Sequence, residues 1–281
     1  MRESSIDRGV LRGLLAEAGV RPSKKLGQNF LADRGVVADI EVIASGWSAE
    51  TIVEIGPGLG ALTERLIDVA RVIAVEVDGR LAEGLENRLG GETKLEVVHE
   101  DILRLDLKSR LGGERCFVVG SLPYRITAPI LKWLIDHRES VCGAALITQR
   151  EVAEKIAASP GKDGSALGIL VRSYADVEIV RRVARGCFVP VPEVESTLWT
   201  LAFLKRPRFE ADPDVFFDVV RALYGTRRKM VRGALRAIVP PETVADILRK
   251  AEVEETARGE ILGFEELDRI AAAIKKQNAV P

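Results

Sequence analysis

The sequence predicts an α/β protein with a mainly parallel sheet, followed by a small all-helical domain. Three observations lead to this prediction. Over the first 200 residues, short apolar runs alternate with segments of helical periodicity, which is typical of parallel strands joined by helices. A glycine-rich turn follows the first strong apolar run. Beyond residue 205 only helical periodicity continues.

The composition is that of a globular protein. The chain has 281 residues, of which 47% are hydrophobic and 30% charged, so disorder is excluded as its main state. The apolar run Val141–Thr148 is shorter than the ~20 residues that a membrane helix needs. The acids Glu3, Asp7 and Glu17 argue against a secretory or mitochondrial leader. A cytoplasmic protein without a membrane partner is therefore expected.

Cysteine and histidine usage excludes further classes of protein. The three cysteines are far apart in no Cys-x-x-Cys pair, and the two histidines stand in no suggestive motif. We therefore expect no disulfide scaffold, metal centre or Ser-His-Asp triad. The net charge of −1 does not by itself indicate a nucleic-acid-binding protein.

The individual elements are predicted in chain order from the same patterns. Short apolar runs indicate strands, and apolar residues recurring every three to four positions indicate helices. The predicted strands are Thr51–Ile55, Val72–Val77, Leu95–His99, Cys116–Gly120 and Gly143–Thr148, with Val177–Val183 and Thr197–Leu204 extending the same sheet. The predicted helices between them include Leu62–Ala70, Gly79–Leu89 and Thr127–His137.

A break in the pattern divides the chain into two predicted domains. Residues 205–213, KRPRFEADP, combine prolines with mixed charges, as linkers do. We predict a catalytic domain with a helical N-terminal segment over residues 1–204, and a helical domain over residues 205–281. The helices expected in the second domain are Val215–Leu223, Arg227–Ile238, Glu242–Ala251 and Phe264–Lys275.

One stretch of the second domain is strongly basic. Residues 219–241 contain no acid and six cations, namely Arg221, Arg227, Arg228, Lys229, Arg232 and Arg236. On one continuous helix, Arg228, Arg232 and Arg236 would share a face at i, i+4 and i+8. Such a face is either solvated or binds phosphate oxygens, with which arginine pairs well.

The glycine-rich turn and the two following strand ends form a candidate ligand site. A strand runs into Gly56 and Gly58 and then into a helix, which fits a dinucleotide-binding turn as well as a simple turn. Glu76 ends the next strand, where an acid can accept hydrogen bonds from both ribose hydroxyls of an adenosine. Asp101 ends the strand after that and either binds an adenine amine or caps a helix. Because parallel strands end at one edge of the sheet, these residues predict an adenosine site.

The fourth strand runs directly into Ser121-Leu122-Pro123-Tyr124. A side-chain oxygen and a backbone carbonyl can accept hydrogen bonds from both protons of an exocyclic amine, which directs the nitrogen lone pair toward an electrophile. An aromatic ring can stack on a base that has been flipped out of its helix. The segment is similar to the (Asp/Asn/Ser)-x-Pro-(Tyr/Phe) motif of methyltransferases that act on such amines. The alternative is a proline-bounded turn without a ligand.

Several motifs together resemble the KsgA-type ribosomal RNA adenine dimethyltransferases, a family that includes the Erm enzymes. EIGPGLG is similar to the first motif of Rossmann-type methyltransferases, and KKLGQNFL, SLPY, FVPVPEVES and TRRKMVR are similar to segments of the family. The resemblance extends from about Gly19 to Glu260. It implies a Rossmann-like class I methyltransferase sheet with helices on both faces, and S-adenosyl-L-methionine as the cofactor.

The resemblance also implies roles for individual residues. Those that would bind the cofactor are Gln28, Asn29, Leu31, Gly56, Gly58, Glu76, Asp101, Ile102 and Ser121. Those that would hold the target adenine are Ser121, Leu122 and Pro123, with Tyr124 and Phe188 on the two faces of its ring. Those that would bind RNA are Arg227, Arg228, Lys229, Arg232 and Arg236. No metal is implied.

We therefore expect a monomeric enzyme that dimethylates adenine amines in small-subunit ribosomal RNA during ribosome biogenesis. The chain departs from the family pattern at Ser121, where the family usually has Asn, at Glu193, where it has Lys, and over residues 162–169. Two alternatives are an Erm-like methylase of large-subunit RNA and a largely non-catalytic RNA-binding assembly factor. An NAD-dependent dehydrogenase would share the glycine turn but would not account for GQNFL or SLPY.

Overall fold

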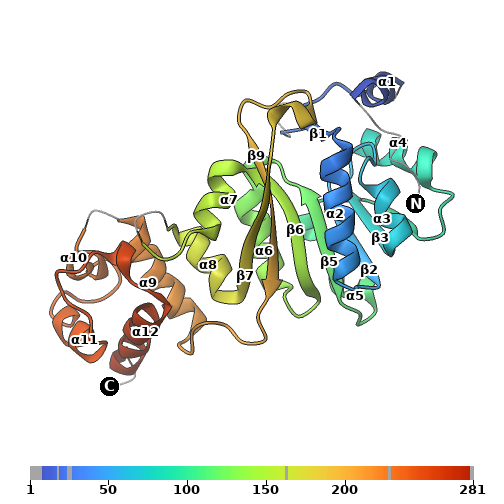
Figure 1. Ribbon diagram of the computed structural model, residues 1–281. Coiled ribbons are helices and arrows are strands. Elements are labelled where there is room, and N and C mark those ends of the chain that lie inside the picture. Colours follow the sequence, from blue (N-terminus) through green and yellow to red (C-terminus); the bar gives the residue numbers. More distant parts are fainter. Residues whose placement is uncertain (1–7, 18, 24–26, 162–163, 227–228, 279–281) are drawn as a thin grey trace. The chain divides into compact units, whose positions relative to one another are not determined.

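A seven-stranded sheet is the central feature of the fold (Figure 1). The computed structural model describes residues 8–17, 19–23, 27–161, 164–226 and 229–278. The strand order is β4-β3-β2-β5-β6-β9-β7. The strands are β2 (Thr51–Ile55), β3 (Arg71–Glu76), β4 (Leu95–His99), β5 (Cys116–Ser121), β6 (Val141–Gln149), β7 (Ala175–Val183) and β9 (Ser196–Phe203). All seven predicted strands are thus present.

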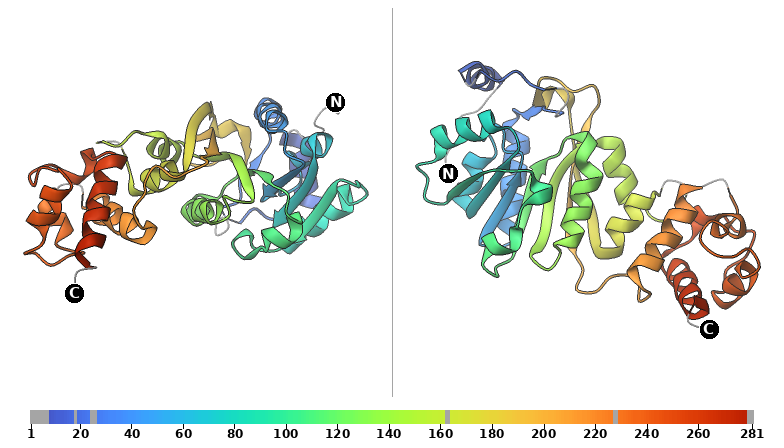
Figure 2. Two further views of the ribbon diagram at one scale, coloured as in Figure 1. Left: turned by 90° about the horizontal axis from the view of Figure 1, so that it is seen from below. Right: turned by 180° about the vertical axis from the view of Figure 1, so that it is seen from behind.

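The sheet is parallel from β4 to β6, and β9 pairs antiparallel to β6. Helices flank both faces of the sheet, as Figure 2 shows. They are α2 (Arg34–Gly46), α3 (Thr63–Val69), α4 (Gly79–Leu89), α5 (Leu107–Leu111), α6 (Thr127–Asp136) and α7 (Arg150–Ala157). The predicted class I architecture is therefore confirmed.

The central strands are buried because helices cover both faces. Every residue of β2 is buried, and β5 is buried up to Gly120. Such strands appear in sequence as continuous apolar runs, and this is why they could be predicted. The chain order reverses at β2, which lies between β3 and β5. Ligands of open α/β sheets bind at the carboxyl ends of the strands beside such a reversal.

The segment before the sheet contains structure that the apolar pattern did not predict. β1 (Phe30–Leu31) and β8 (Phe188–Val189) form a two-stranded antiparallel sheet, although 157 residues separate the paired Leu31 and Phe188. The first helix, α1 (Arg8–Glu17), buries Leu11 and Leu15 against Leu59 of the glycine turn. The N-terminal segment therefore packs on the carboxyl edge of the sheet.

The contacts divide the described chain into two compact units. The first runs to Ala153 and includes Glu178–Phe203, and the second contains Glu154–Val177 together with the residues from Leu204 onward. The second unit includes α8 (Ala166–Tyr174), α9 (Pro213–Gly225), α10 (Val231–Leu235), α11 (Val244–Lys250) and α12 (Phe264–Asn278). No helix within the described ranges is both long enough and apolar enough to cross a membrane.

The sequence predicted one domain boundary, after residue 204. The structure divides the chain differently, because α8, which precedes that boundary, packs with the C-terminal helices. The Tyr174 ring meets Phe209 at 5.5 Å between centroids, and Phe209 stacks on Phe216 at 4.3 Å. Arg208 donates to the carbonyl of Ala175 at 3.0 Å. Aromatic contacts between segments distant in sequence thus assign α8 to the second unit.

The prediction of one helix over Arg227–Ile238 was wrong. Met230 is extended and forms an isolated bridge with Arg258, and α10 spans only Val231–Leu235. Arg227 and Arg228 lie outside the described residues, and Arg236 follows the end of α10. The proposed i, i+4, i+8 stripe on a single helix therefore does not exist, because the chain bends around the buried Val231.

Candidate functional site

The main pocket of the first unit lies at the carboxyl ends of β2, β3, β4 and β5. Its volume is about 260 Å³, and it is lined by residues at and beyond these strand ends and by the segment before β1. Such a pocket at a reversal of strand order is the expected ligand site of an open α/β sheet. The predicted residues that line it are Gln28, Asn29, Gly56, Gly58, Glu76, Asp101, Ile102, Ser121 and Pro123.

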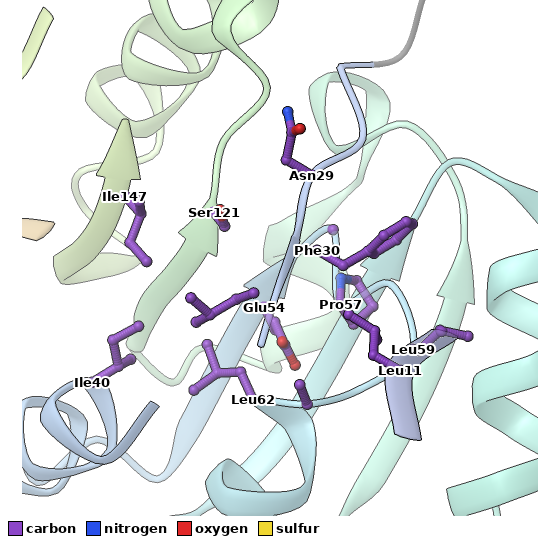
Figure 3. Close-up of a pocket in the computed structure, with 13 residues that line it drawn as sticks. Leu11, Asn29, Phe30, Ile40, Glu54, Pro57, Leu59, Leu62, Ser121 and Ile147 are labelled. Carbon is purple, nitrogen blue, oxygen red and sulfur yellow. The ribbon is translucent and has the colours of Figure 1, made fainter. Parts of the chain in front are cut away.

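A smaller cavity of about 50 Å³ shares part of this lining, and Figure 3 shows the residues around it. Asn29, Phe30, Gly56 and Ser121 border both spaces. The smaller cavity is otherwise apolar, apart from the carboxyl group of Glu54. Leu31 and Leu11 also reach it, so the N-terminal segment forms one of its walls.

Glu76 fixes the glycine turn from the end of β3. One carboxylate oxygen accepts from the Gly58 amide at 3.1 Å, and the other accepts from the Asp78 amide at 3.0 Å. Burial raises the pKa of Glu76, and the amides of Asp78 and Gly58 oppose that rise. The two hydrogen bonds thus hold the carboxylate at the wall of the main pocket.

Glu54 is an acid in a strand that is otherwise apolar. Its side chain accepts a hydrogen bond from the Thr63 hydroxyl at 2.6 Å, and the residue is only 2% exposed. Burial raises the pKa of Glu54 to about 7, although the Thr63 hydroxyl lowers it and Arg88 does so by its charge. The small cavity therefore contains a carboxyl group that titrates near neutral pH.

Asp101 is a helix cap that also lines the pocket. Its Oδ1 accepts from the Leu103 amide at 3.0 Å, at the start of η1 (Ile102–Arg104). The two interpretations of Asp101 are therefore compatible, because the cap engages one oxygen and the residue still lines the main pocket. Ile102 is 4% exposed and lines the same pocket.

The Gln28 side chain is held by the protein itself. Its Oε1 accepts from the Ser23 amide at 2.8 Å, and its Nε2 donates to Asp78 at 3.3 Å. Asn29 donates to the carbonyl of Gly27 at 3.2 Å. Gln28 thus fastens the segment before β1 to Asp78, the N-cap of α4 just beyond β3.

The target motif is only partly assembled at the pocket. Ser121 ends β5 and borders both spaces, while Leu122 is 3% exposed and its amide donates to the Ile147 carbonyl at 2.9 Å. Pro123 lines the main pocket, and Tyr124 begins η2 (Tyr124–Ile126), but its side chain lies outside what the structure describes.

Phe188 does not line either space. It is 2% exposed and belongs to the hydrophobic core, because its pairing with Leu31 turns the ring inward. The expected stack of Phe188 on a target base is therefore not available in this structure. The apolar residues around position 188 are the signal in the sequence that could have indicated a buried segment.

The predicted RNA-binding cations of the second unit differ in exposure and in ion pairing. Arg232 lies on α10 and pairs with Glu255 at 3.1 Å, with 56% of its side chain exposed. Lys229 and Arg236 are exposed. Arg227 and Arg228 lie outside the described residues. In the part of the chain that the structure describes, no cluster of His, Cys, Asp or Glu is arranged to hold a metal ion.

Two site residues were not predicted as such. Glu54 was noticed only as part of a family motif, although an acid inside an apolar strand is itself a signal of function. Phe30 lies between the two spaces, and its ring would be 2.7 Å from a Cβ on Gly58. Only the fold reveals that contact.

Comparison with known proteins identifies the family. The family model "Ribosomal RNA adenine dimethylase" matches residues 20–274. A relative from Moorella thermoacetica, "Ribosomal RNA small subunit methyltransferase A", is 38% identical over 280 residues, which cover 95% of this chain and 97% of the relative. A relative of the same name from Clostridium acetobutylicum is 35% identical and covers 94% and 97%.

Solved structures agree with this assignment. The 23S rRNA methyltransferase ErmE superposes with a TM-score of 0.67 at 29% identity and covers 88% of this chain and all of the other. A dimethyladenosine transferase from Plasmodium falciparum has the same fold, with a TM-score of 0.77 at 23% identity over 89% of this chain and 98% of the other. The chain belongs to the ribosomal RNA adenine dimethylase family.

Proposed function

We propose that this protein is a methyltransferase that uses S-adenosyl-L-methionine to dimethylate the exocyclic amine of adenines in small-subunit ribosomal RNA. One observation carries the proposal. A single pocket brings together the glycine turn, the acids Glu76 and Asp101, and Ser121 with Pro123 of the target motif. An adenosine site and a set of acceptors for an amine therefore adjoin each other.

The chemistry of the lining fits this cofactor. S-Adenosylmethionine supplies an electrophilic methyl group on a positively charged sulfonium. Glu76 would accept hydrogen bonds from the ribose hydroxyls, and Asp101 with Ile102 would bind the adenine. Gly56 and Gly58 would let the backbone approach the methionine part, with Gln28, Asn29 and Leu31 closing the segment over it.

Glu54 also argues against a dinucleotide cofactor. A pyrophosphate held by the glycine turn would lie beside the cavity that contains Glu54, and the two negative charges would repel each other. A cationic sulfonium and ammonium would be attracted there instead. The Glu54 carboxyl group therefore favours S-adenosylmethionine over NAD.

The target amine would be activated by position. Its lone pair is delocalised into the adenine ring, so it is a weak nucleophile. Acceptors at Ser121 and at the Leu122–Pro123 backbone would hold its two protons and direct the lone pair at the methyl carbon. The N–C bond forms as the S–C bond breaks, and the amine proton leaves to solvent. Positioning and hydrogen bonds would supply the catalysis, without a metal.

The relatives support small-subunit RNA as the substrate. Those named as small-subunit methyltransferases reach 38% identity, whereas the large-subunit enzyme ErmE reaches 29%. In the second unit, the exposed cations Lys229, Arg232 and Arg236 would contact phosphates. Arg227 and Arg228 are proposed for the same role from the sequence. We further propose that the protein acts as a monomer in the cytoplasm.

The test is methyl transfer from labelled S-adenosylmethionine to unmethylated small and large ribosomal subunits in parallel, with nucleoside analysis. Dimethyladenosine in the small subunit is expected. Label in the large subunit would instead establish Erm-like activity. No label on either subunit, with cofactor binding intact, would favour an RNA-binding assembly factor.

A further inference from the structure

We infer that Leu11 of α1 forms an apolar wall for the amino-acid part of S-adenosylmethionine and thereby favours the complete cofactor over smaller adenosine compounds. This inference rests on the proposed binding of S-adenosylmethionine and adds a residue to that site. α1 ends at Glu17, whereas the match to the family model begins at residue 20. The family motifs in the sequence all lie beyond this helix.

α1 packs on the glycine turn by one face. Its buried residues are Leu11, which is 1% exposed, and Leu15, which is 6% exposed. Because they are four positions apart, they lie on the same side of the helix. Both belong to one hydrophobic cluster with Leu59 and Ala61, which follow the first two glycines of the turn.

The end of the helix accounts for the burial of Leu15. The Val20 amide donates to the Leu15 carbonyl at 2.9 Å, and Val20 packs in the same cluster. The Gly19 amide donates to the Ala16 carbonyl at 3.1 Å, and the φ of Gly19 is +60°. These two bonds form a Schellman cap, in which the apolar residue after the glycine contacts the last turn of the helix. The cap holds Leu15 in place without a ligand.

Leu11 lies one turn before Leu15 and borders the smaller cavity. It shares this lining with Gly56, Pro57 and Leu59 of the glycine turn, and Figure 3 shows its side chain beside that of Leu59. Leu15 is not among the described residues that line the cavity. The two leucines therefore share a cluster, but only Leu11 forms part of a space that a ligand can enter.

The smaller cavity continues the proposed cofactor site past the glycine turn. Glu76 of the proposed adenosine site lines the main pocket, and Gly56 borders both spaces. A cofactor with its adenosine in the main pocket would therefore extend its amino-acid part past Gly56 into the smaller cavity. The methylene groups of that part would lie against Leu11, and its ammonium group would be attracted by the Glu54 carboxyl group. An adenosine compound without the amino-acid part would not reach Leu11.

The experiment compares two ligands by titration calorimetry, S-adenosylmethionine and 5′-methylthioadenosine, which lacks the amino-acid part. Leu11→Ala removes most of the wall, and Leu11→Phe places a larger side chain at the cavity. Both variants should weaken S-adenosylmethionine binding about tenfold, since one methylene group more or less in an apolar pocket changes affinity by about that factor. Their affinity for 5′-methylthioadenosine should equal that of the wild type.

Leu15→Ala is the matched control, because it removes the same atoms from the same helix face and the same cluster. Leu15→Ala and Leu11→Ala should both lower the melting temperature, since both leucines are buried. Only Leu11→Ala should lose affinity for S-adenosylmethionine. A loss of affinity in Leu15→Ala as large as in Leu11→Ala would assign Leu11 to the packing of α1 and overturn the inference.

Two further results would also overturn it, namely wild-type affinity for S-adenosylmethionine in both Leu11 variants, or equal losses of affinity for the two ligands. Failure of the wild-type protein to bind S-adenosylmethionine would overturn the proposed cofactor and the inference with it. Binding without methyl transfer to ribosomal subunits would overturn only the proposed reaction, because the role of Leu11 is tested by binding alone.

Discussion

At the scale of single residues, the carboxyl group of Glu54 couples stability to the charge of the candidate site. It ionises near pH 4.5 when exposed and near pH 7 in the fold. Between these values the native state holds a proton that the unfolded state has released. The free energy of unfolding therefore falls as pH rises from 4.5 through 7, by about 3 kcal/mol in total.

Glu54→Gln should remove this penalty while keeping a partner for the Thr63 hydroxyl. The gain in unfolding free energy over the wild type should be larger at pH 8 than at pH 5, as measured by urea denaturation at both values. Glu50→Gln, at an exposed position just before β2, should show no such pH dependence. An equal effect of Glu54→Gln at both pH values would contradict the assigned pKa shift.

Glu76 is the residue on which the proposed adenosine site depends most. Each of its oxygens accepts from one backbone amide and the residue is 5% exposed, so Gln keeps the size of the side chain, removes the charge and replaces one of the two acceptors with a donor. Glu76→Gln should weaken S-adenosylmethionine binding about tenfold to a hundredfold, since each hydrogen bond to a charged group contributes about 1.5–3 kcal/mol. Titration calorimetry checks this, with the exposed Glu83→Gln on α4 as the control. Unchanged affinity would remove Glu76 from the site.

At the scale of elements, the site depends on the close approach of β1 to the glycine turn. Gly58 has a φ of +57°, and its missing Cβ makes room for the Phe30 ring. Gln28 fastens the preceding residues to Asp78. The glycine turn therefore contacts β1, and the segment before β1 is bonded to the residues just after β3. A substitution in the turn should thus move residues that line both the main pocket and the smaller cavity.

Gly58→Ala should destabilise the protein by roughly 1–3 kcal/mol, because a non-glycine residue is strained at this φ and its Cβ would overlap Phe30. Cofactor affinity should fall as well. Gly46→Ala, at the end of α2 with open space around it, should be neutral or slightly stabilising. Thermal denaturation and calorimetry of both variants check this, and equal stability of the two would refute the role of the Phe30 contact.

At the scale of the whole molecule, the second unit is proposed to supply RNA affinity and the first to supply chemistry. Replacing Lys229, Arg232 and Arg236 together with Ala should weaken binding to unmethylated small subunits and flatten its dependence on salt, because each phosphate that the protein no longer neutralises keeps its counterions. S-Adenosylmethionine affinity should not change. The matched control replaces Arg249, Lys250 and Lys275, cations of the same unit that pair with Asp246 and Asp212. An unchanged salt slope in the first variant would assign these residues to a solvated surface.

Much of the central sheet could be predicted from the sequence, because its strands depend on local patterns. The strands β2, β3, β5 and β6 are largely buried, and the edge strand β4 is partly buried, so each appears as an apolar run, and Glu76, Asp101 and Ser121 stand where runs end. The pairing of Leu31 with Phe188 could not be predicted, since two-residue strands have no period. The same holds for the assignment of α8 to the second unit, which depends on Tyr174 meeting Phe209.

The sequence by itself determined the α/β class, the carboxyl-edge location of the site and, through its motifs, the family. Strand periodicity and strand ends are local properties, and motifs can be read without coordinates. Only the tertiary structure decided that Phe188 belongs to the core, that the basic stretch is not one helix, and that Phe30 packs against Gly58 of the glycine turn. These depend on packing between segments distant along the chain, where burial and shape rather than local pattern determine what each side chain contacts.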